Sequence, residues 1–222
     1  MGLDMYLKKA KRKIECVTPN EIVLVEDYLD YLLRPSKYES STFKEWCGKD
    51  IEDVDMEIVD AYRGEYQTRY GAWDTEKKYG YLGLFDGVGY WRKANQIHNW
   101  FVENVQYGND DCGIYEVTKD QLEELLDLCY TVQMKSKLVD GKVKNGQRIV
   151  NGAWKNIIED GKVIEDPSVA QELLPASPGF FFGSTEYDQW YMDNINYTID
   201  MIERVLRETD FEHEIVAYRA SW

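Results

Sequence analysis

The chain has 222 residues, of which 44% are hydrophobic and 30% are charged, and its formal net charge is −15. This balance is typical of a folded globular protein, and 14% aromatic residues exclude a disordered chain. The acidic excess repels nucleic-acid phosphates and anionic lipid, so we expect no direct nucleic-acid binding and no membrane binding. Any anion site would be a local exception. No apolar run approaches the roughly 20 residues that a membrane span needs.

The N-terminal stretch lacks the apolar segment of a signal peptide. The four cysteines stand far apart and form no CxxC motif. We therefore expect reduced thiols and a cytoplasmic protein. The chain length predicts a single domain over 1–222.

In the first part of the chain, alternating apolar and polar residues over 2–8 predict a half-buried strand. Apolar residues at helical spacing predict a helix over 19–33, which stops before Pro35. Residues 36–78 are polar and acidic with scattered aromatics, and we expect a short helix over 53–62.

Beyond them we predict a glycine-interrupted strand over 79–86 and then a helix over 90–105. A short strand is expected over 113–117. Thr118 opens a capping-box pattern, so it should cap a helix that ends near residue 134.

In the last part, short β-prone runs over 137–166 predict a hairpin excursion that would serve as an insertion or a partner arm. Its turn signals are the Asp-Gly and Asn-Gly pairs that end at Gly141, Gly146, Gly152 and Gly161. We expect a strand over 179–182, a helix over 186–208 and a final strand over 211–218. This alternation predicts an α+β fold, a mixed α/β sandwich with about five core strands and helices packed on the sheet.

The segment from residue 90 to residue 100 carries the densest group of polar and aromatic side chains. On the predicted helix, Trp91 and His98 fall in the apolar arc and Asn95 falls at its edge. Arg92 lies on the flank beside Asn95, and Lys93 points elsewhere. One interpretation is a buried histidine bonded to a backbone carbonyl, and the other is the floor of a ligand pocket. We expect no metal, because the ligand spacing is missing.

A second group follows the strand predicted over 179–182. Ser184 and Thr185 stand at the predicted helix start, where they would cap it. Alternatively, their hydroxyls and the first amides of the helix would hold a phosphate or carboxylate. Tyr187 and Trp190 would offer stacking faces. The segment is neither a P-loop nor a nucleophile elbow.

Several blocks of the sequence resemble an uncharacterised family of small phage and prophage proteins. The blocks are the opening MGLDMYL, the segment YWRKANQIHNWF, the NDDCG turn and the segment GFFFGSTEYDQWY. The resemblance implies a phage or bacterial cytoplasm and carries no established activity. It also implies that residues 36–78 and 137–170 are variable insertions within the single domain.

Three functions remain open at this point. The first is binding of an anionic, nucleotide-like small molecule without a cofactor, which in a phage protein would sequester a host immune signalling nucleotide as an anti-defence activity. A homodimer would suit a symmetric ligand. The second is a hydrolase with His98 as acid or base, assisted by Asp110 or Asp111. The third is an acidic interaction module or DNA mimic built on residues 45–60. The binder would use Trp91, Arg92, Lys93, Asn95, His98, Ser184, Thr185, Tyr187 and Trp190.

Overall fold

The computed structural model describes residues 2–33, 41–76, 83–150, 152–179 and 182–222. Its centre is a four-stranded antiparallel sheet with the strand order β2-β1-β6-β3. The two inner strands are β1 (Asp4–Lys11) and β6 (Glu214–Ser221), and the outer strands are β2 (Asp86–Arg92) and β3 (Ile114–Val117). The predicted α+β fold is confirmed, although the described central sheet has four strands where about five were expected.

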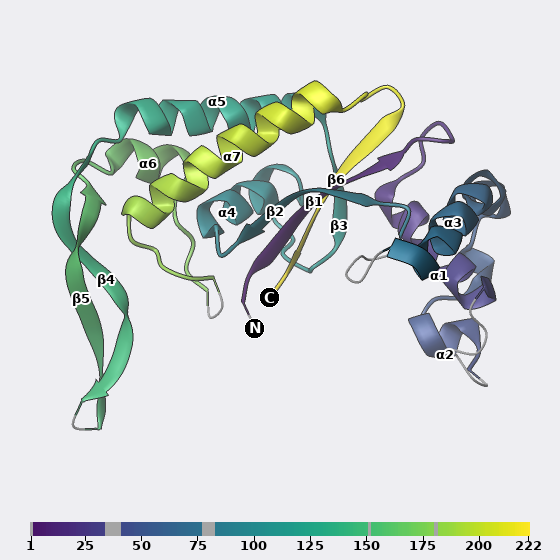
Figure 1. The fold of residues 1–222 in the computed structure, drawn as a ribbon, viewed down its shortest axis with the longest axis horizontal. Coiled ribbons are helices and arrows are strands. Elements are labelled where there is room, and N and C mark those ends of the chain that lie inside the picture. Colours follow the sequence, from purple (N-terminus) through teal and green to yellow (C-terminus); the bar gives the residue numbers. More distant parts are fainter. Residues whose placement is uncertain (1, 34–40, 77–82, 151, 180–181) are drawn as a thin grey trace.

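One face of the sheet is covered by three helices, α4 (Asn95–Asn104), α5 (Lys119–Lys135) and α7 (Gln189–Glu208). In Figure 1, α4 lies to the left of the sheet, and α5 and α7 lie above it. The short helix α6 (Ser168–Leu173) lies beside α5. Because successive side chains of a strand point to opposite faces, alternate residues of β1 point into this layer, where they are fully buried.

The other face is covered at one end by α1 (Pro19–Leu33), α2 (Phe43–Cys47), a 3-10 helix (Ile51–Asp53) and α3 (Met56–Glu76). This second core contains Ile215 and Ala217 of β6 and side chains of α1 and α3. The sheet therefore separates two hydrophobic cores.

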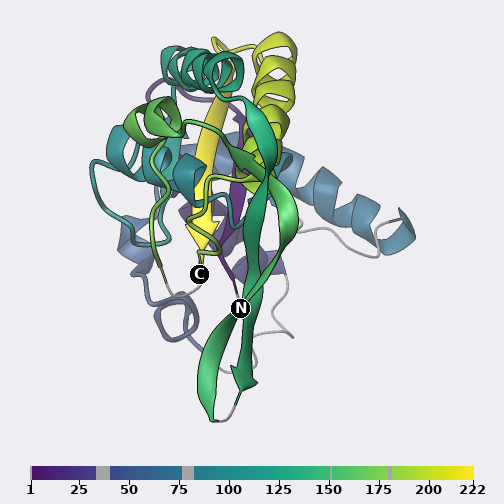
Figure 2. The same cartoon turned by 90° about the vertical axis from the view of Figure 1, so that its left-hand side faces the viewer.

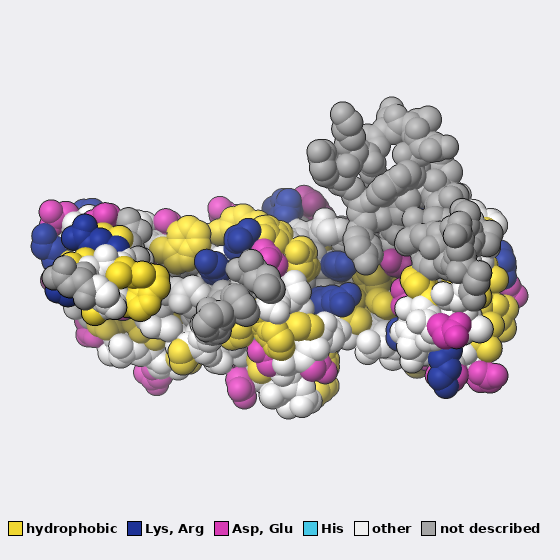
Figure 3. Space-filling model, turned by 90° about the horizontal axis from the view of Figure 1, so that it is seen from below, with side chains coloured by type: hydrophobic (Ala, Val, Ile, Leu, Met, Phe, Trp, Pro, Cys, Tyr) yellow, Lys and Arg dark blue, Asp and Glu magenta, His cyan; other side chains and the backbone are white. Residues whose placement is uncertain are grey.

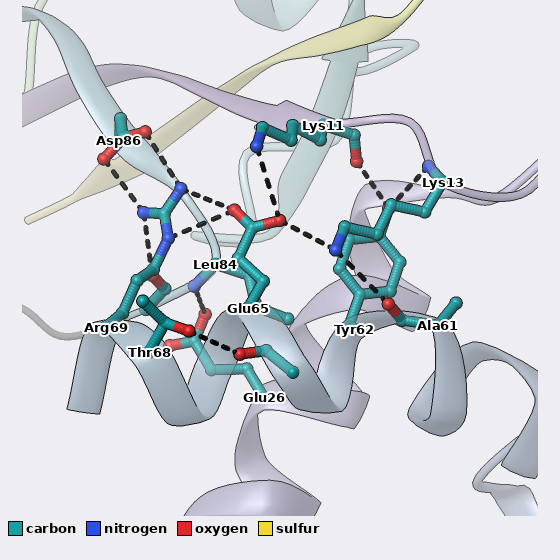
Figure 4. Close-up of polar contacts among 12 residues, drawn as sticks. Lys11, Lys13, Glu26, Ala61, Tyr62, Glu65, Thr68, Arg69, Leu84 and Asp86 are labelled. Carbon is teal, nitrogen blue, oxygen red and sulfur yellow. Dashed lines mark hydrogen bonds and ion pairs between the residues drawn. The ribbon is translucent and has the colours of Figure 1, made fainter. Parts of the chain in front are cut away.

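An ion-pair network joins α3 to the sheet (Figure 4). The guanidinium of Arg69 donates to Glu65 at 2.8 Å and to Asp86 of β2 at 2.9 Å. The ammonium of Lys13 lies 3.0 Å from the same Glu65 carboxylate. The hydroxyl of Tyr62 donates to the carbonyl oxygen of Lys11 at 2.5 Å. These contacts fix α3 against the ends of β1 and β2.

A long hairpin of β4 (Leu138–Val150) and β5 (Ala153–Ile164) extends away from both layers, as Figures 1 and 2 show from two sides. We call this hairpin the arm. The predicted hairpin is confirmed as one ribbon, in which Gly141 and Gly161 are paired within the strands. Gly146 lies at an irregularity in the pairing and Gly152 lies in the turn. Both have left-handed φ values, which glycine adopts without strain.

The predicted elements over 2–8, 19–33, 113–117 and 118–134 are confirmed as β1, α1, β3 and α5, with small shifts of their ends. The capping box of α5 is present. The Thr118 hydroxyl accepts from the backbone N–H of Gln121, and the Gln121 side-chain oxygen accepts from the backbone N–H of Thr118. The helix predicted over 53–62 overlaps the longer α3, and the final strand predicted over 211–218 corresponds to β6.

The prediction of a helix over 90–105 is wrong at its start. Tyr90, Trp91 and Arg92 belong to β2, and α4 begins at Asn95. Lys93 separates the two elements with a left-handed φ of 60°. The strand predicted over 79–86 is wrong for residues 83–85, and its residues 79–82 lie outside the described part.

The last predicted helix also starts later than expected. It begins at Gln189 and is capped by Asp188, which accepts from the amide of Tyr191 at 3.1 Å. Ser184 and Thr185 therefore do not cap it. Gly179 and Phe182 lie in irregular backbone, so the strand predicted over 179–182 is wrong for these residues, while 180–181 lie outside the described part. None of the described helices has the length and apolar character needed to cross a membrane.

Candidate functional site

A pocket of about 470 Å³ lies where α4, the end of β6 and the segment before α7 meet. Its lining combines a histidine, a carboxylate and aromatic rings with small residues. The lining residues are His98, Asn99, Val102, Asp110, Ser177, Pro178, Gly179, Phe182 and Trp222.

His98 sits on the inward face of α4, and only 1% of its surface is exposed. Its Nδ1 lies 2.8 Å from the hydroxyl of Tyr218, and its Nε2 lies 3.1 Å from Oδ2 of Asp110. An ionised carboxylate only accepts hydrogen bonds, so Nε2 carries the proton that is donated to Asp110. In the neutral imidazole, Nδ1 then accepts from the Tyr218 hydroxyl.

The electrostatics support a neutral imidazole. Burial lowers the pKa of His98, against the hydrogen bond and charge of Asp110, which raise it. Burial also raises the pKa of Tyr218 well above its ordinary value, so its hydroxyl keeps its proton. The ring of Tyr218 stacks on Phe101 with 3.9 Å between centroids, which holds the hydroxyl in place.

Asp110 is the polar group that faces the pocket. Its carboxylate also accepts from the indole N–H of Trp222, which lies 3.1 Å from each oxygen. A carboxylate has about four lone-pair positions, and two protein donors leave room for a ligand donor. The side chain of Asp110 is 29% exposed, whereas that of His98 is almost completely covered. Asp110 is therefore presented to the pocket and His98 orients it from behind.

Asn95 fixes the wall of the pocket. Its amide nitrogen donates to the carbonyl oxygens of Phe182 at 3.1 Å and Ser184 at 2.8 Å. Its amide oxygen accepts from the backbone N–H of Ser177 at 3.1 Å. The ring of Phe182 stands edge-on to His98, with 5.1 Å between centroids. Asn95 thus acts as a latch for the segment that carries Ser177 and Phe182, and it does not itself line the pocket.

Trp91 lies in the first hydrophobic core, not in the pocket. It is 2% exposed, and its indole N–H donates to Thr198 of α7 at 2.9 Å. Successive residues of a strand point to opposite faces, so Arg92 is exposed on the other side of the sheet. Lys93 is half-buried next to Gly183, where an added Cβ would lie 3.0 Å from the Cβ of Lys93.

The remaining predicted residues precede α7 or lie at its start. Ser184 and Thr185 are exposed, and the Ser184 hydroxyl accepts from the amide of Glu186 at 3.1 Å. The Tyr187 hydroxyl accepts from the backbone N–H of Ala176 at 3.0 Å, which ties down the same segment. Trp190 is 53% exposed on the first turn of α7. The structure brings His98 to the pocket and places these four residues outside its lining.

Sequence reasoning missed Tyr218 and Trp222 and considered Asp110 only as a helper of a catalytic histidine. The continuous apolar run over 215–218 is the signal that could have found Tyr218, because such a run is typical of a strand buried on both faces. Trp222 carries no such signal, since its position depends on the end of β6 meeting the Asp110 turn.

One group of described side chains lies close enough together to share a metal ion, namely Asp210, Glu212 and His213. All three are exposed, and His213 already bonds to Asp210 at 2.9 Å, which raises the pKa of the imidazole. This arrangement is a surface turn held by its own hydrogen bonds.

Comparisons with protein-family models, with curated proteins and with solved structures find no match to this chain. The resemblance to a phage and prophage family therefore stays a prediction, and the fold and the pocket are the basis for any functional proposal.

Proposed function

We propose that this protein binds a small, nucleotide-like molecule in the pocket, with the donor edge of a nitrogen heterocycle held by Asp110. The observation that carries the proposal is the fixed carboxylate. His98 and Trp222 hold it from one side, and the other side is open to the pocket. Because an ionised carboxylate only accepts, the ligand atoms that meet it are N–H or O–H donors.

The lining favours a flat aromatic ligand over an aliphatic one. Trp222 and Phe182 supply aromatic surface on which a heterocycle can stack. A volume of about 470 Å³ suits a nucleoside-sized occupant. A guanine-like base presents two neighbouring N–H donors. One of them would bond to the open position of the Asp110 carboxylate, and the other would take the place of the Trp222 N–H. We therefore propose a purine of this kind as the preferred class.

The charge of the pocket limits where a phosphate can lie. The described lining contains a carboxylate and no Lys or Arg, so it favours a neutral base over an anionic group. A cation that could bind a phosphate near the pocket is Lys93, which packs against Gly183. Gly183 directly follows Phe182 of the pocket wall. In our proposal the phosphate of a nucleotide leaves the pocket along this segment and meets Lys93 there.

Binding is favoured over hydrolysis. A general base needs a ring nitrogen within reach of the substrate, but both nitrogens of His98 are already hydrogen-bonded and the side chain is buried. Binding without turnover is also what sequestration of a signalling nucleotide in a host cytoplasm would require. That anti-defence role remains a prediction from the sequence.

Isothermal titration calorimetry with guanosine, inosine and uridine tests the proposal. Inosine lacks the exocyclic amine of guanosine, and uridine has a single N–H between two acceptors. We expect guanosine to bind more tightly than both. We also expect Asp110→Asn to weaken guanosine binding by at least about 10-fold, because a hydrogen bond to a charged group is worth about 1.5–3 kcal/mol.

The neighbouring carboxylate provides a matched control. Asp111 accepts from the amide of Gly113 and the hydroxyl of Tyr115 and does not line the pocket, so Asp111→Asn should bind like the wild type. Trp222→Phe keeps an aromatic ring, loses the N–H and should weaken binding less than Asp110→Asn. Equal affinity of the wild type and Asp110→Asn would refute the proposal, and conversion of the nucleoside during titration would favour the hydrolase.

A further inference from the structure

The outer half of the arm, residues 144–150 and 152–158, differs in charge from the rest of the chain. It contains Lys144, Arg148 and Lys155 and no Asp or Glu. Taking these three positive charges out of the total of −15 leaves −18 for the remainder. Viewed from below, dark-blue side chains gather at the left-hand end of the molecule beside yellow ones (Figure 3). The arm is thus a local exception to an acidic protein.

The strand register increases the difference in charge between the inner and outer halves of the arm. In the inner half of the arm, opposed residues neutralise each other, since Lys142 lies 2.7 Å from Asp160 and Lys162 lies 3.0 Å from Asp140. In the outer half, Arg148 is paired directly with Lys155. Like charges in opposed positions destabilise a ribbon.

No carboxylate of the described chain pairs with either of these two cations, and both are exposed. An anion bound by either side chain would offset their repulsion.

The other face of the outer half carries uncovered apolar side chains. Ile149 and Trp154 are opposed in the register, and they are 62% and 68% exposed. Ile158 is 55% exposed and paired with Lys144. A two-stranded ribbon on its own is marginally stable in water, so a partner that covers these side chains would stabilise it.

The arm also carries its cations away from the acidic body. Val163 pairs with Asp188 at the start of α7, which marks the root of the arm. From Val163 to Lys155 the strand extends about 26 Å, at ~3.3 Å per residue. Salt screens charges over about 8 Å at physiological ionic strength. The repulsion of phosphates by the body is therefore weak at the outer half.

We propose that the outer half of the arm binds double-stranded DNA by inserting into the major groove. The groove of B-DNA is about 12 Å wide and admits a two-stranded β-ribbon. Trp154 and Ile149 would face the base edges and thymine methyl groups. Arg148 and Lys155 lie on the outward face of the ribbon, one on each strand, and their long side chains would reach the phosphates along the two edges of the groove. The deep and narrow major groove of an RNA duplex does not admit a ribbon, so the occupant is DNA.

Fluorescence anisotropy with a labelled DNA duplex of about 20 base pairs, close to two helical turns, tests this proposal. Three cations predict a slope of log K against log salt of about −2.7, which is about 40-fold weaker binding at 200 mM than at 50 mM salt. Arg148→Gln with Lys155→Gln should reduce the slope to about −0.9. The same sequence as an RNA duplex should bind at least about 10-fold more weakly than the DNA.

The inner half of the same ribbon supplies the control. Lys142→Gln with Lys162→Gln removes the same number of cations, but these two already have carboxylate partners, so DNA binding should stay within about twofold. Circular dichroism of both double variants checks the fold. Absence of DNA binding at 50 mM salt, or equal binding by the Arg148/Lys155 variant, would overturn the proposal. Concentration-dependent self-association that needs Trp154, without DNA binding, would overturn it in favour of a second copy as the partner.

Discussion

Glu26 of α1 offers a quantitative test of the contact between this helix and the segment that precedes β2. Its carboxylate accepts from the backbone N–H of Leu84 at 2.8 Å (Figure 4). Burial raises the pKa of Glu26 from its ordinary value of 4.5 to about 7. The charges of Asp27 and Asp30 also raise it, whereas the Leu84 amide and Lys8 lower it. Glu26→Gln keeps the shape and an acceptor for Leu84 and removes the titration.

The size of the effect follows from the two pKa values. Folded Glu26 keeps its proton up to about pH 7, while the unfolded chain releases it near pH 4.5. The folded state binds more protons in this window, so the free energy of unfolding falls as the pH rises through it. At about 1.4 kcal/mol per pH unit, the loss is about 3 kcal/mol. The advantage of Glu26→Gln over the wild type should therefore grow by about 3 kcal/mol from acidic to neutral pH.

Urea unfolding followed by circular dichroism measures this difference, on both proteins at several pH values between 4.5 and about 7. His98 acts in the opposite direction, because its lowered folded-state pKa makes the protein lose stability as the pH falls below 6.5. Both proteins contain His98, so its contribution cancels in the comparison. A difference between variant and wild type that stays constant over the whole range would refute the reasoning.

Three further substitutions test separate contacts. Thr118→Ala removes the cap of α5, so urea unfolding should show a loss of about 1 kcal/mol; an unchanged midpoint would contradict this. Tyr218→Phe removes the donor to Nδ1 of His98, which costs about 1–3 kcal/mol. Losing this bond to the neutral imidazole also raises the pKa of His98, and an unchanged NMR titration would argue against the tautomer assigned here. Asn95→Ala should cost about 2 kcal/mol and speed proteolysis between residues 175 and 185; wild-type protection there would show that the latch is dispensable.

The sequence predicted correctly those elements that are determined by neighbouring residues in the chain. The helix over 19–33 has clear apolar spacing and a proline after its end, and α1 has the same bounds. The capping box at Thr118 is a three-residue pattern, and it forms as expected. The alternation over 2–8 predicted β1 because one face of that strand is fully buried.

The helix around Lys93 was predicted to start too early. Over a few residues, the apolar spacing of a strand cannot be distinguished from that of a helix. Trp91, Ile97 and Phe101 are all buried, which fits one long amphipathic helix. The structure instead breaks the chain at Lys93, so that β2 presents Trp91 to the core and the following α4 presents His98 and Ile97. The positions of Trp91 and His98 in the apolar arc agree with their burial, but Trp91 lies in the core and not in the pocket where a ligand-binding residue was expected.

The site itself depends on contacts between distant parts of the chain. The partners of His98 are Asp110, which is close in sequence, and Tyr218, which is 120 residues away. The sequence could suggest the first, because an acidic turn follows the helix. The second arises only when β6 enters the sheet beside β1, and no local pattern records that pairing.

Native mass spectrometry of the wild type and of Asp110→Asn, each mixed with guanosine, tests the central claim most directly. We predict one non-covalent adduct of the mass of guanosine on the wild type. The adduct should be lost from Asp110→Asn and retained by Asp111→Asn. An adduct of equal abundance on Asp110→Asn, or no adduct on the wild type, would contradict the assignment of the Asp110 pocket as the binding site.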